Sequence, residues 1–166
     1  GVELFEQPCD AEDWDANAAV AAVSRVPLML DEPICALADI DRAAGIEGVG
    51  LCKVKLKRFG SLAQLEEAIR HLQARGLGAV LGDGLGAEIN CWMEACVADG
   101  LIDNAGEFNG FVKIRPEVRL LAEPLPFDKG EILLPAGWRP EVDRQRLQAR
   151  CLESERFAAP ALGALG

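Results

Sequence analysis

The sequence predicts an α/β fold in which parallel strands alternate with helices. Short apolar runs recur along the chain, a helical stretch fills each interval between them, and each run ends on a charged side chain. The charged residues follow one another at intervals of 24 to 28 residues, close to the roughly 30 residues per unit of a (β/α)8 barrel. They are Glu6, Asp31, Lys55, Asp83 and Glu107. This alternation is typical of a parallel sheet.

Each predicted element has a local signal in the sequence. Apolar runs predict strands over residues 2–8, 26–31, 49–56, 78–81 and, with its following loop, 104–113. Apolar stripes at helical spacing predict helices over residues 10–24, 36–44, 61–75 and 87–98. The third helix has the strongest pattern, because Ser61 is a plausible N-cap and leucine and isoleucine then repeat every three or four residues.

The pattern changes after Pro116. Short strands are expected over residues 118–121 and 131–134, around a turn at 128–130, and a last helix over residues 141–152. We therefore divide the chain into barrel units over residues 1–116 and a C-terminal extension over residues 117–166.

Composition excludes several kinds of partner. The chain has 17 basic and 27 acidic residues, a net charge of −10, which repels nucleic acid and anionic membranes. No apolar run reaches the roughly 20 residues of a membrane span, and no signal peptide is recognisable. The six cysteines form no CxxC pair and lie mostly among apolar residues, which favours reduced thiols and a cytoplasmic protein.

Length indicates an incomplete barrel. The 166 residues hold five strand–helix units, whereas a closed eight-unit barrel needs about 250 residues. Five parallel strands alone would leave two open sheet edges, which favour aggregation. We therefore expect the chain to pair with an N-terminal half of a barrel. A non-catalytic half-barrel is the alternative.

Two carboxylates are candidate metal ligands. Glu6 and Asp31 end successive strands, and the chain turns directly after each of them at a proline-containing stretch. The carboxyl ends of parallel strands meet at one rim, and carboxylate oxygens are ligands that Mg²⁺ prefers. The alternative is that both are solvated loop acids of an acidic protein.

Three lysines are candidate bases. Lys53, Lys55 and Lys57 alternate along one predicted strand and so share a face. A buried lysine needs a partner or a function, and one near a metal-bound carboxylate is a credible general base. We favour Lys55 and keep Lys53 in reserve. A solvated lysine face on an edge strand is the alternative.

Three segments resemble a known family. Residues 4–8, 27–32 and 54–60 resemble the fourth, fifth and sixth barrel strands of the enolase superfamily, in the mandelate racemase and muconate lactonizing enzyme branch, and the likeness extends to residues 82–84 and 106–107. The resemblance implies the C-terminal part of a TIM (β/α)8 barrel, strands 4–8, plus the extension. It also implies that Glu6 and Asp31 are the second and third Mg²⁺ ligands.

Further roles follow from the same resemblance. Lys55 would be the acid/base, Glu32 an acid adjacent to the ligands, and Glu107 a group near the substrate at the eighth strand. Asp83 stands after the seventh strand, where the racemase-type histidine is absent; the single histidine, His71, is expected to be a half-exposed helix residue. The family's first ligand and its other lysine belong to strands that this chain does not contain.

The family chemistry is Mg²⁺-assisted removal of the proton α to a substrate carboxylate. The resulting enediolate leads to epimerisation, cycloisomerisation or elimination, so the resemblance implies an isomerase or lyase. The implied partners are a small carboxylate substrate, the N-terminal half of the barrel, a capping domain, and further copies in a homo-oligomer of the full-length protein.

A nucleotide site is the competing interpretation. The loop at residues 82–87 fits G-x-G-x-x-A between a strand and a helix, and Glu107 follows Ala87 by 20 residues, as a ribose-binding acid would. This alternative leaves Glu6, Asp31 and Lys55 without a role at three successive strand ends.

Overall fold

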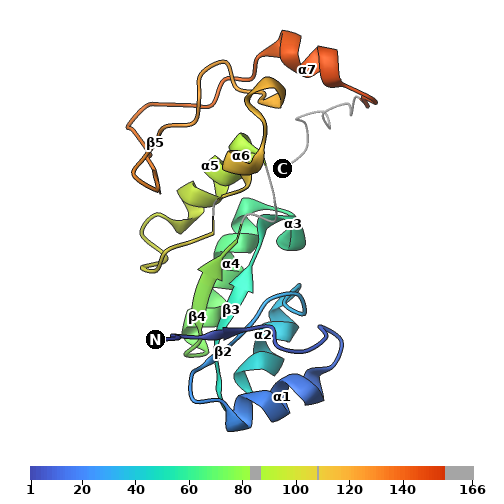
Figure 1. Ribbon diagram of the computed structural model, residues 1–166, viewed down its shortest axis with the longest axis vertical. Helices are drawn as coiled ribbons and strands as arrows, with labels where there is room; N and C mark the ends of the chain where they lie inside the picture. Colours follow the sequence, from blue (N-terminus) through green and yellow to red (C-terminus); the bar gives the residue numbers. More distant parts are fainter. Residues whose placement is uncertain (83–86, 108, 156–166) are drawn as a thin grey trace, which may run out of the picture.

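The computed structural model describes residues 1–82, 87–107 and 109–155. Its centre is a four-stranded sheet in which neighbouring strands follow chain order and every pairing is parallel. The strands are β1 (Phe5–Glu6), β2 (Leu28–Leu30), β3 (Val49–Val54) and β4 (Gly78–Leu81). The register between β2 and β3 shifts between Leu28 and Met29. The predicted parallel α/β arrangement is therefore confirmed (Figure 1).

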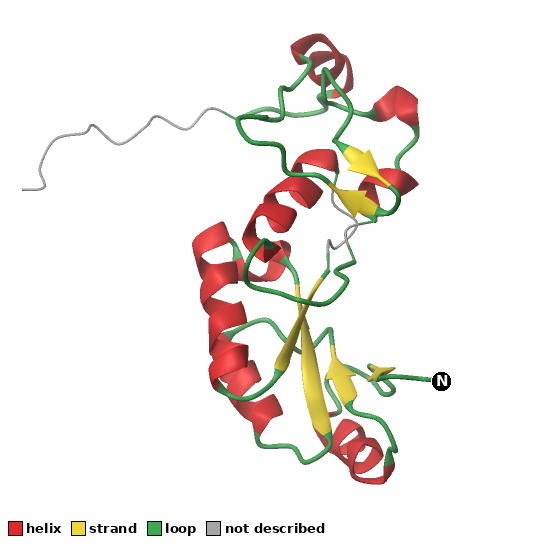
Figure 2. Cartoon of the chain, turned by 90° about the vertical axis from the view of Figure 1, so that its left-hand side faces the viewer, coloured by secondary structure: helices red, strands yellow, loops and turns green. Residues whose placement is uncertain are grey.

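Helices fill the intervals between the strands, as the sequence predicts. They are α1 (Trp14–Val23), α2 (Leu37–Ala44), α4 (Leu62–Ala74) and α5 (Glu88–Ala98). The predicted N-cap of α4 is confirmed, because the Gln64 N–H donates to Ser61 Oγ at 3.2 Å. Figure 2 shows α4 along one side of the central strands and the N-terminus on the opposite side.

The two faces of the sheet differ, as expected from the two-residue period of strands. On one face Leu30, Val54 and Leu81 belong to the main core, where they pack with Leu65 and Ile69 of α4. The other face contributes to an open pocket of about 400 Å³. Its lining residues are Glu3, Leu4, Glu6, Met29, Leu51, Val80, Asn104, Ala105 and Glu107. The sheet is thus covered by helices on one face and open on the other.

The third strand ends earlier than predicted. It stops at Val54, and a four-residue helix, α3 (Leu56–Phe59), follows at once. The Leu56 N–H donates to Oε1 of the fully buried Glu94 at 3.0 Å, and Gly60 ends α3 with a left-handed φ of 77°. The prediction that three lysines share one face of a strand is therefore wrong, because Lys57 lies exposed on α3.

The predicted strand over residues 104–113 is also wrong in extent. Glu107 forms an isolated parallel bridge to Gly82, and α6 (Gly110–Lys113) occupies the end of the segment. Asparagine and glycine are frequent in this segment and form strands poorly. A single bridge still places Glu107 beside the end of β4.

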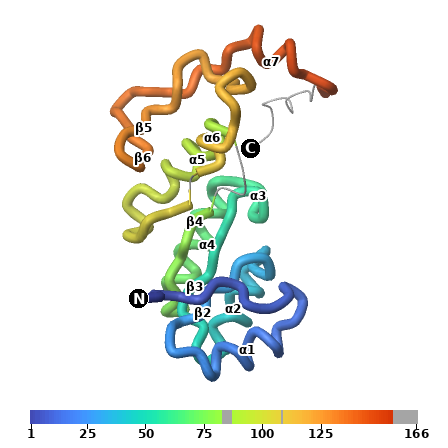
Figure 3. Tube along the Cα trace, in the orientation of Figure 1, coloured from blue at the N-terminus to red at the C-terminus, as the bar shows by residue number. Residues whose placement is uncertain are grey.

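The residues after 116 form only short elements. They are the 3₁₀ helix η1 (Pro116–Val118), β5 (Phe127–Asp128), β6 (Glu131–Ile132) and α7 (Arg144–Arg150). The turn at 128–130 is confirmed, but the strand expected over 118–121 is wrong, because only Leu121 pairs there, with Val142. The β5–β6 hairpin lies near α5 and α6 in the upper half of Figure 3, whereas the N-terminus lies in the lower half. The domain boundary at 116 stays a prediction.

The cysteines are less uniformly buried than expected. All six are free; Cys52 and Cys91 are buried, but Cys35, Cys96 and Cys151 are exposed. In the described part of the chain, no helix combines the length and apolarity needed to cross a membrane.

Burial predicts which thiols react. It raises the pKa of Cys52 to about 12, and the thiolate is the reactive form. In native protein at pH 8, iodoacetamide should modify Cys35 while leaving Cys52 unmodified, and both should react in urea. Peptide mass spectrometry measures each site. Equal rates of modification in native protein would contradict the packing of Cys52.

Candidate active site

Five charged residues meet at the carboxyl end of the sheet. Glu6 ends β1 and Asp31 directly follows β2. Lys53 lies near the end of β3, and Lys55 directly follows that strand. Glu107 reaches the same edge through its bridge to Gly82. Because the strands are parallel, their ends converge at one edge, where α/β proteins bind ligands.

Lys53 lies between two carboxylates. Its ammonium contacts Glu6 Oε1 and donates to Glu107 Oε2 at 2.9 Å. The Lys53 side chain is 3% exposed, whereas those of Glu6 and Glu107 are 38% and 48% exposed. Burial lowers the pKa of Lys53, but the hydrogen bonds to Glu6 and Glu107 together raise it by more. The pKa of Lys53 therefore lies above its usual value. Lys53 is therefore held in its charged form.

Lys55 and Arg58 share the second carboxylate. The Lys55 ammonium lies 2.7 Å from Asp31 Oδ2, and Nη2 of Arg58 lies 2.8 Å from Asp31 Oδ1. Arg58 also donates to the Asp31 carbonyl oxygen. Burial raises the pKa of Asp31, but the hydrogen bonds from Lys55 and Arg58 more than offset this, so the pKa lies below its usual value. Asp31 is thus ionised at neutral pH.

Sequence reasoning missed Arg58. It follows Lys55 by three residues, a spacing that brings side chains together only on a helix. The sequence predicts a strand through residue 56, and on a strand this spacing places the two side chains on opposite faces. Arg58 is the second cation that contacts Asp31.

Gln7 fixes the chain after Glu6. Its side-chain oxygen accepts the Asp31 N–H at 2.9 Å, and its φ of 32° is one that residues other than glycine rarely adopt. The Gln7 amide also donates to the Cys9 carbonyl at 3.0 Å. This contact links the residue after Glu6 to the backbone of Asp31, so the two strand ends are joined by more than the sheet.

Gly82 makes room for both lysines. A Cβ at this position would lie 3.1 Å from Cε of Lys55 and 3.2 Å from Cδ of Lys53, closer than side chains normally pack. This gives the first glycine of the G-x-G-x-x-A pattern a role unrelated to nucleotide binding. Asp83 and the rest of that loop through residue 86 lie outside the described residues.

Two predicted residues lie away from these ion pairs. The Glu32 side chain is exposed, and its predicted role stays a prediction. Nε2 of His71 lies 2.7 Å from Asp41 Oδ1, between α4 and α2, so the prediction of a partly exposed helix residue is confirmed. Neither residue belongs to the group of side chains around Lys53 and Lys55.

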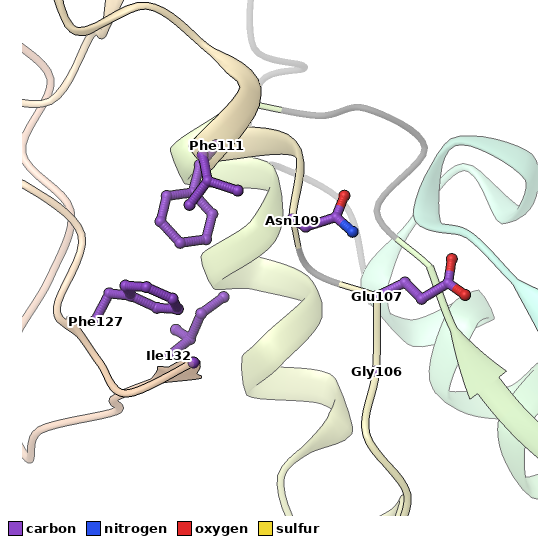
Figure 4. A pocket seen from close by; sticks show the side chains of 8 residues that line it. Gly106, Glu107, Asn109, Phe111, Phe127 and Ile132 are labelled. Carbon is purple, nitrogen blue, oxygen red and sulfur yellow. The ribbon is translucent and has the colours of Figure 1, made fainter.

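A pocket of about 320 Å³ adjoins Glu107. Phe111, Phe127 and Ile132 form an apolar side of it, and Asn109 lies between them and Glu107 (Figure 4). The Glu107 carboxylate points away from the apolar side chains, toward the sheet. The ion pairs at the sheet edge therefore border a hollow with polar and apolar parts.

The donor set fits Mg²⁺ in type. Glu6 and Asp31 supply carboxylate oxygens from adjacent parallel strands, and Mg²⁺ in proteins is commonly bound by one or two carboxylates together with water. Across residues 1–82, 87–107 and 109–155, no group of three or more histidine, cysteine, aspartate or glutamate side chains is arranged to hold a metal. A metal site with three or more such protein ligands would need side chains from outside these residues.

Comparison with known families assigns this chain to one of them. The family model described as enolase C-terminal domain-like matches residues 1–140. The chain belongs to the enolase C-terminal domain-like family. The predicted membership of the enolase superfamily, in the mandelate racemase and muconate lactonizing enzyme branch, is confirmed.

Two curated relatives of this enolase-family chain are enzymes. Muconate cycloisomerase 1 of Acinetobacter baylyi is 26% identical over 160 residues, which are 89% of this chain and 40% of the relative. The aromatic dipeptide epimerase of Herpetosiphon aurantiacus is 35% identical over 79 residues, 48% of this chain and 22% of the relative. The chain thus spans less than half the length of either relative.

Solved structures show the same fold. The muconate lactonizing enzyme of Pseudomonas putida matches with a TM-score of 0.80 and 22% identity, over 90% of this chain and 42% of that structure. A mandelate racemase/muconate lactonizing protein of Herpetosiphon aurantiacus matches with a TM-score of 0.59 and 29% identity, over 66% of this chain and 31% of that structure. The predicted C-terminal part of an enolase-type barrel is confirmed.

Proposed function

We propose that the complete protein is an isomerase or lyase that removes the proton α to the carboxylate of a small substrate. The observation that carries this proposal is the contact of 2.7 Å between Lys55 Nζ and Asp31 Oδ2, which puts a candidate base beside a candidate metal ligand. The enzymatic activities in the names of the two relatives support the same class.

Glu6 and Asp31 would hold Mg²⁺. When bound, the ion would polarise the substrate carboxylate and acidify the adjacent C–H group. The 38% exposure of the Glu6 side chain leaves it open to a ligand. These assignments follow the family resemblance, and the shared sheet edge supports them.

Lys55 is the proposed base. Its ammonium must lose a proton before it can accept one from the substrate. Arg58 contacts the other oxygen of Asp31 at 2.8 Å, so Asp31 keeps a cationic partner while Lys55 is neutral. This arrangement allows Lys55 to change its protonation state without leaving Asp31 as an unpaired buried charge.

The remaining parts of the enzyme lie outside this chain in our proposal. The open sheet face and the exposed side chains of Val2 and Phe5, 74% and 46% exposed, support pairing of β1 with the N-terminal half of a barrel. A capping domain, assembly as a homo-oligomer and a cytoplasmic location complete the proposal. Whether the reaction ends in epimerisation, cycloisomerisation or elimination depends on groups beyond the proposed base.

Deuterium exchange tests this function. The full-length protein should catalyse exchange of the α-proton of small carboxylic acids, including N-acyl amino acids, dipeptides and hydroxy acids, in D₂O containing Mg²⁺. Proton NMR follows the loss of the α-proton signal. EDTA should abolish the exchange, and added Mg²⁺ should restore it. Exchange that continues unchanged in EDTA would contradict the metal-assisted mechanism.

A further inference from the structure

Lys53 is the most buried charged group of the active-site edge. Its side chain is 3% exposed, compared with 15% for Lys55 and 11% for Arg58. Its ammonium contacts Glu6, at the end of β1, and Glu107, beside the end of β4. β1 and β4 are not adjacent in the sheet, so the Lys53 side chain joins the ends of two separated strands.

Lys53, in β3, and Lys55, directly after it, contact different carboxylates. Lys55 contacts Asp31, whereas Lys53, two residues earlier on the same face, contacts Glu6 and Glu107. The hydrogen-bond partners of Lys53 therefore do not include Asp31, the carboxylate that contacts the proposed base Lys55. Gly82 leaves space for the Lys53 side chain, since a Cβ there would lie 3.2 Å from its Cδ.

We infer that Lys53 is a positioning residue, whose ammonium orients the Glu6 carboxylate for Mg²⁺ and holds Glu107 beside it. The inference rests on the proposed function, because Glu6 is a ligand only in that proposal. The Glu6 side chain is partly exposed and has several staggered rotamers available. A buried donor bound to one of its oxygens selects among those rotamers and leaves the other oxygen for the ion.

Magnesium titration of the full-length protein tests this role. Removing a group that orients a ligand typically weakens metal binding or activity by 10–100-fold. Isothermal titration calorimetry should therefore give a 10–100-fold higher Kd for Mg²⁺ in Lys53→Met than in the wild type. Lys57→Met is the matched control, because it makes the same chemical change at an exposed position on α3, and its Kd should equal that of the wild type.

Kinetics distinguish positioning from a general loss of structure. In Lys53→Met, the Mg²⁺ concentration that gives half-maximal exchange should rise by the same factor as Kd. At saturating Mg²⁺, kcat should fall by a smaller factor than the one by which Kd rises. A merely structural defect would lower kcat through the fraction of folded protein and leave the half-maximal Mg²⁺ concentration unchanged.

A second variant covers the risk of misfolding. Lys53→Met leaves Glu6 and Glu107 without their shared cation, so Lys53→Met/Glu107→Gln removes one of the two charges and should fold. It should also bind Mg²⁺ 10–100-fold more weakly than the wild type. If either variant folds and binds Mg²⁺ with wild-type affinity, this inference is overturned and the proposed function is not. Failure of the wild type to bind Mg²⁺ would overturn the proposed function and this inference with it.

Discussion

Replacing Lys55 with alanine should lower the rate of α-proton exchange by about 10²–10⁴-fold, the usual contribution of a general base. Mg²⁺ binding should largely persist, because Glu6 and Asp31 remain and Arg58 still contacts Asp31 at 2.8 Å. Proton NMR in D₂O measures the exchange rate, and calorimetry measures the affinity for Mg²⁺.

Lys57→Ala is the matched control for this experiment. Lys57 is exposed on α3 and follows Lys55 by two residues, so its replacement should leave the exchange rate unchanged. If Lys55→Ala exchanges the α-proton at nearly the wild-type rate, the base must lie elsewhere. Lys53 or a group outside this chain would then have to take that role.

Replacing Asp31 with asparagine should cost about 3–5 kcal/mol of the free energy of unfolding, because removing one partner of a buried ion pair leaves unpaired charge. The Asp31 side chain is 6% exposed, and its partners Lys55 and Arg58 are 15% and 11% exposed. Urea unfolding at pH 7 measures the loss. Glu32→Gln removes the adjacent, exposed carboxylate and should change stability by less than about 0.5 kcal/mol.

The stability loss in Asp31→Asn should depend on pH in one direction. The pKa of Asp31 in the folded protein lies below its usual value. Its ionised form therefore contributes full stability above the unfolded pKa of about 3.9, and this contribution disappears as the pH falls through the lower folded value. Wild type and variant should accordingly converge below about pH 4. A difference that stays constant from pH 7 to pH 3 would contradict the assigned ion pairs.

The strand–helix alternation could be predicted because it depends on local patterns. Apolar runs of the right length gave β2 and β4 to within a few residues, and Ser61 marked the start of α4. The short helix α3 could not be predicted in the same way. It depends on the contact between the Leu56 N–H and the buried Glu94, 38 residues away, which no local pattern contains.

The candidate site was predictable by position but not by partner. A charge at the end of each parallel strand must reach the common edge, which is why Glu6, Asp31 and Lys55 could be named. Which lysine contacts which carboxylate depends on strand register and on side-chain length, neither of which the alternation specifies. Arg58 became recognisable only with α3, as its place on a helix brings it back to Asp31.

The division of carboxylates between Lys53 and Lys55 also constrains how β3 can align during folding. A slip of one residue would turn both ammonium groups toward the helices, into the core that holds Val54 and Leu81. A slip of two residues would keep both lysines on this face but move both along the strand, away from their present carboxylate partners. The same charges proposed for catalysis therefore select the correct strand alignment over its nearest alternatives.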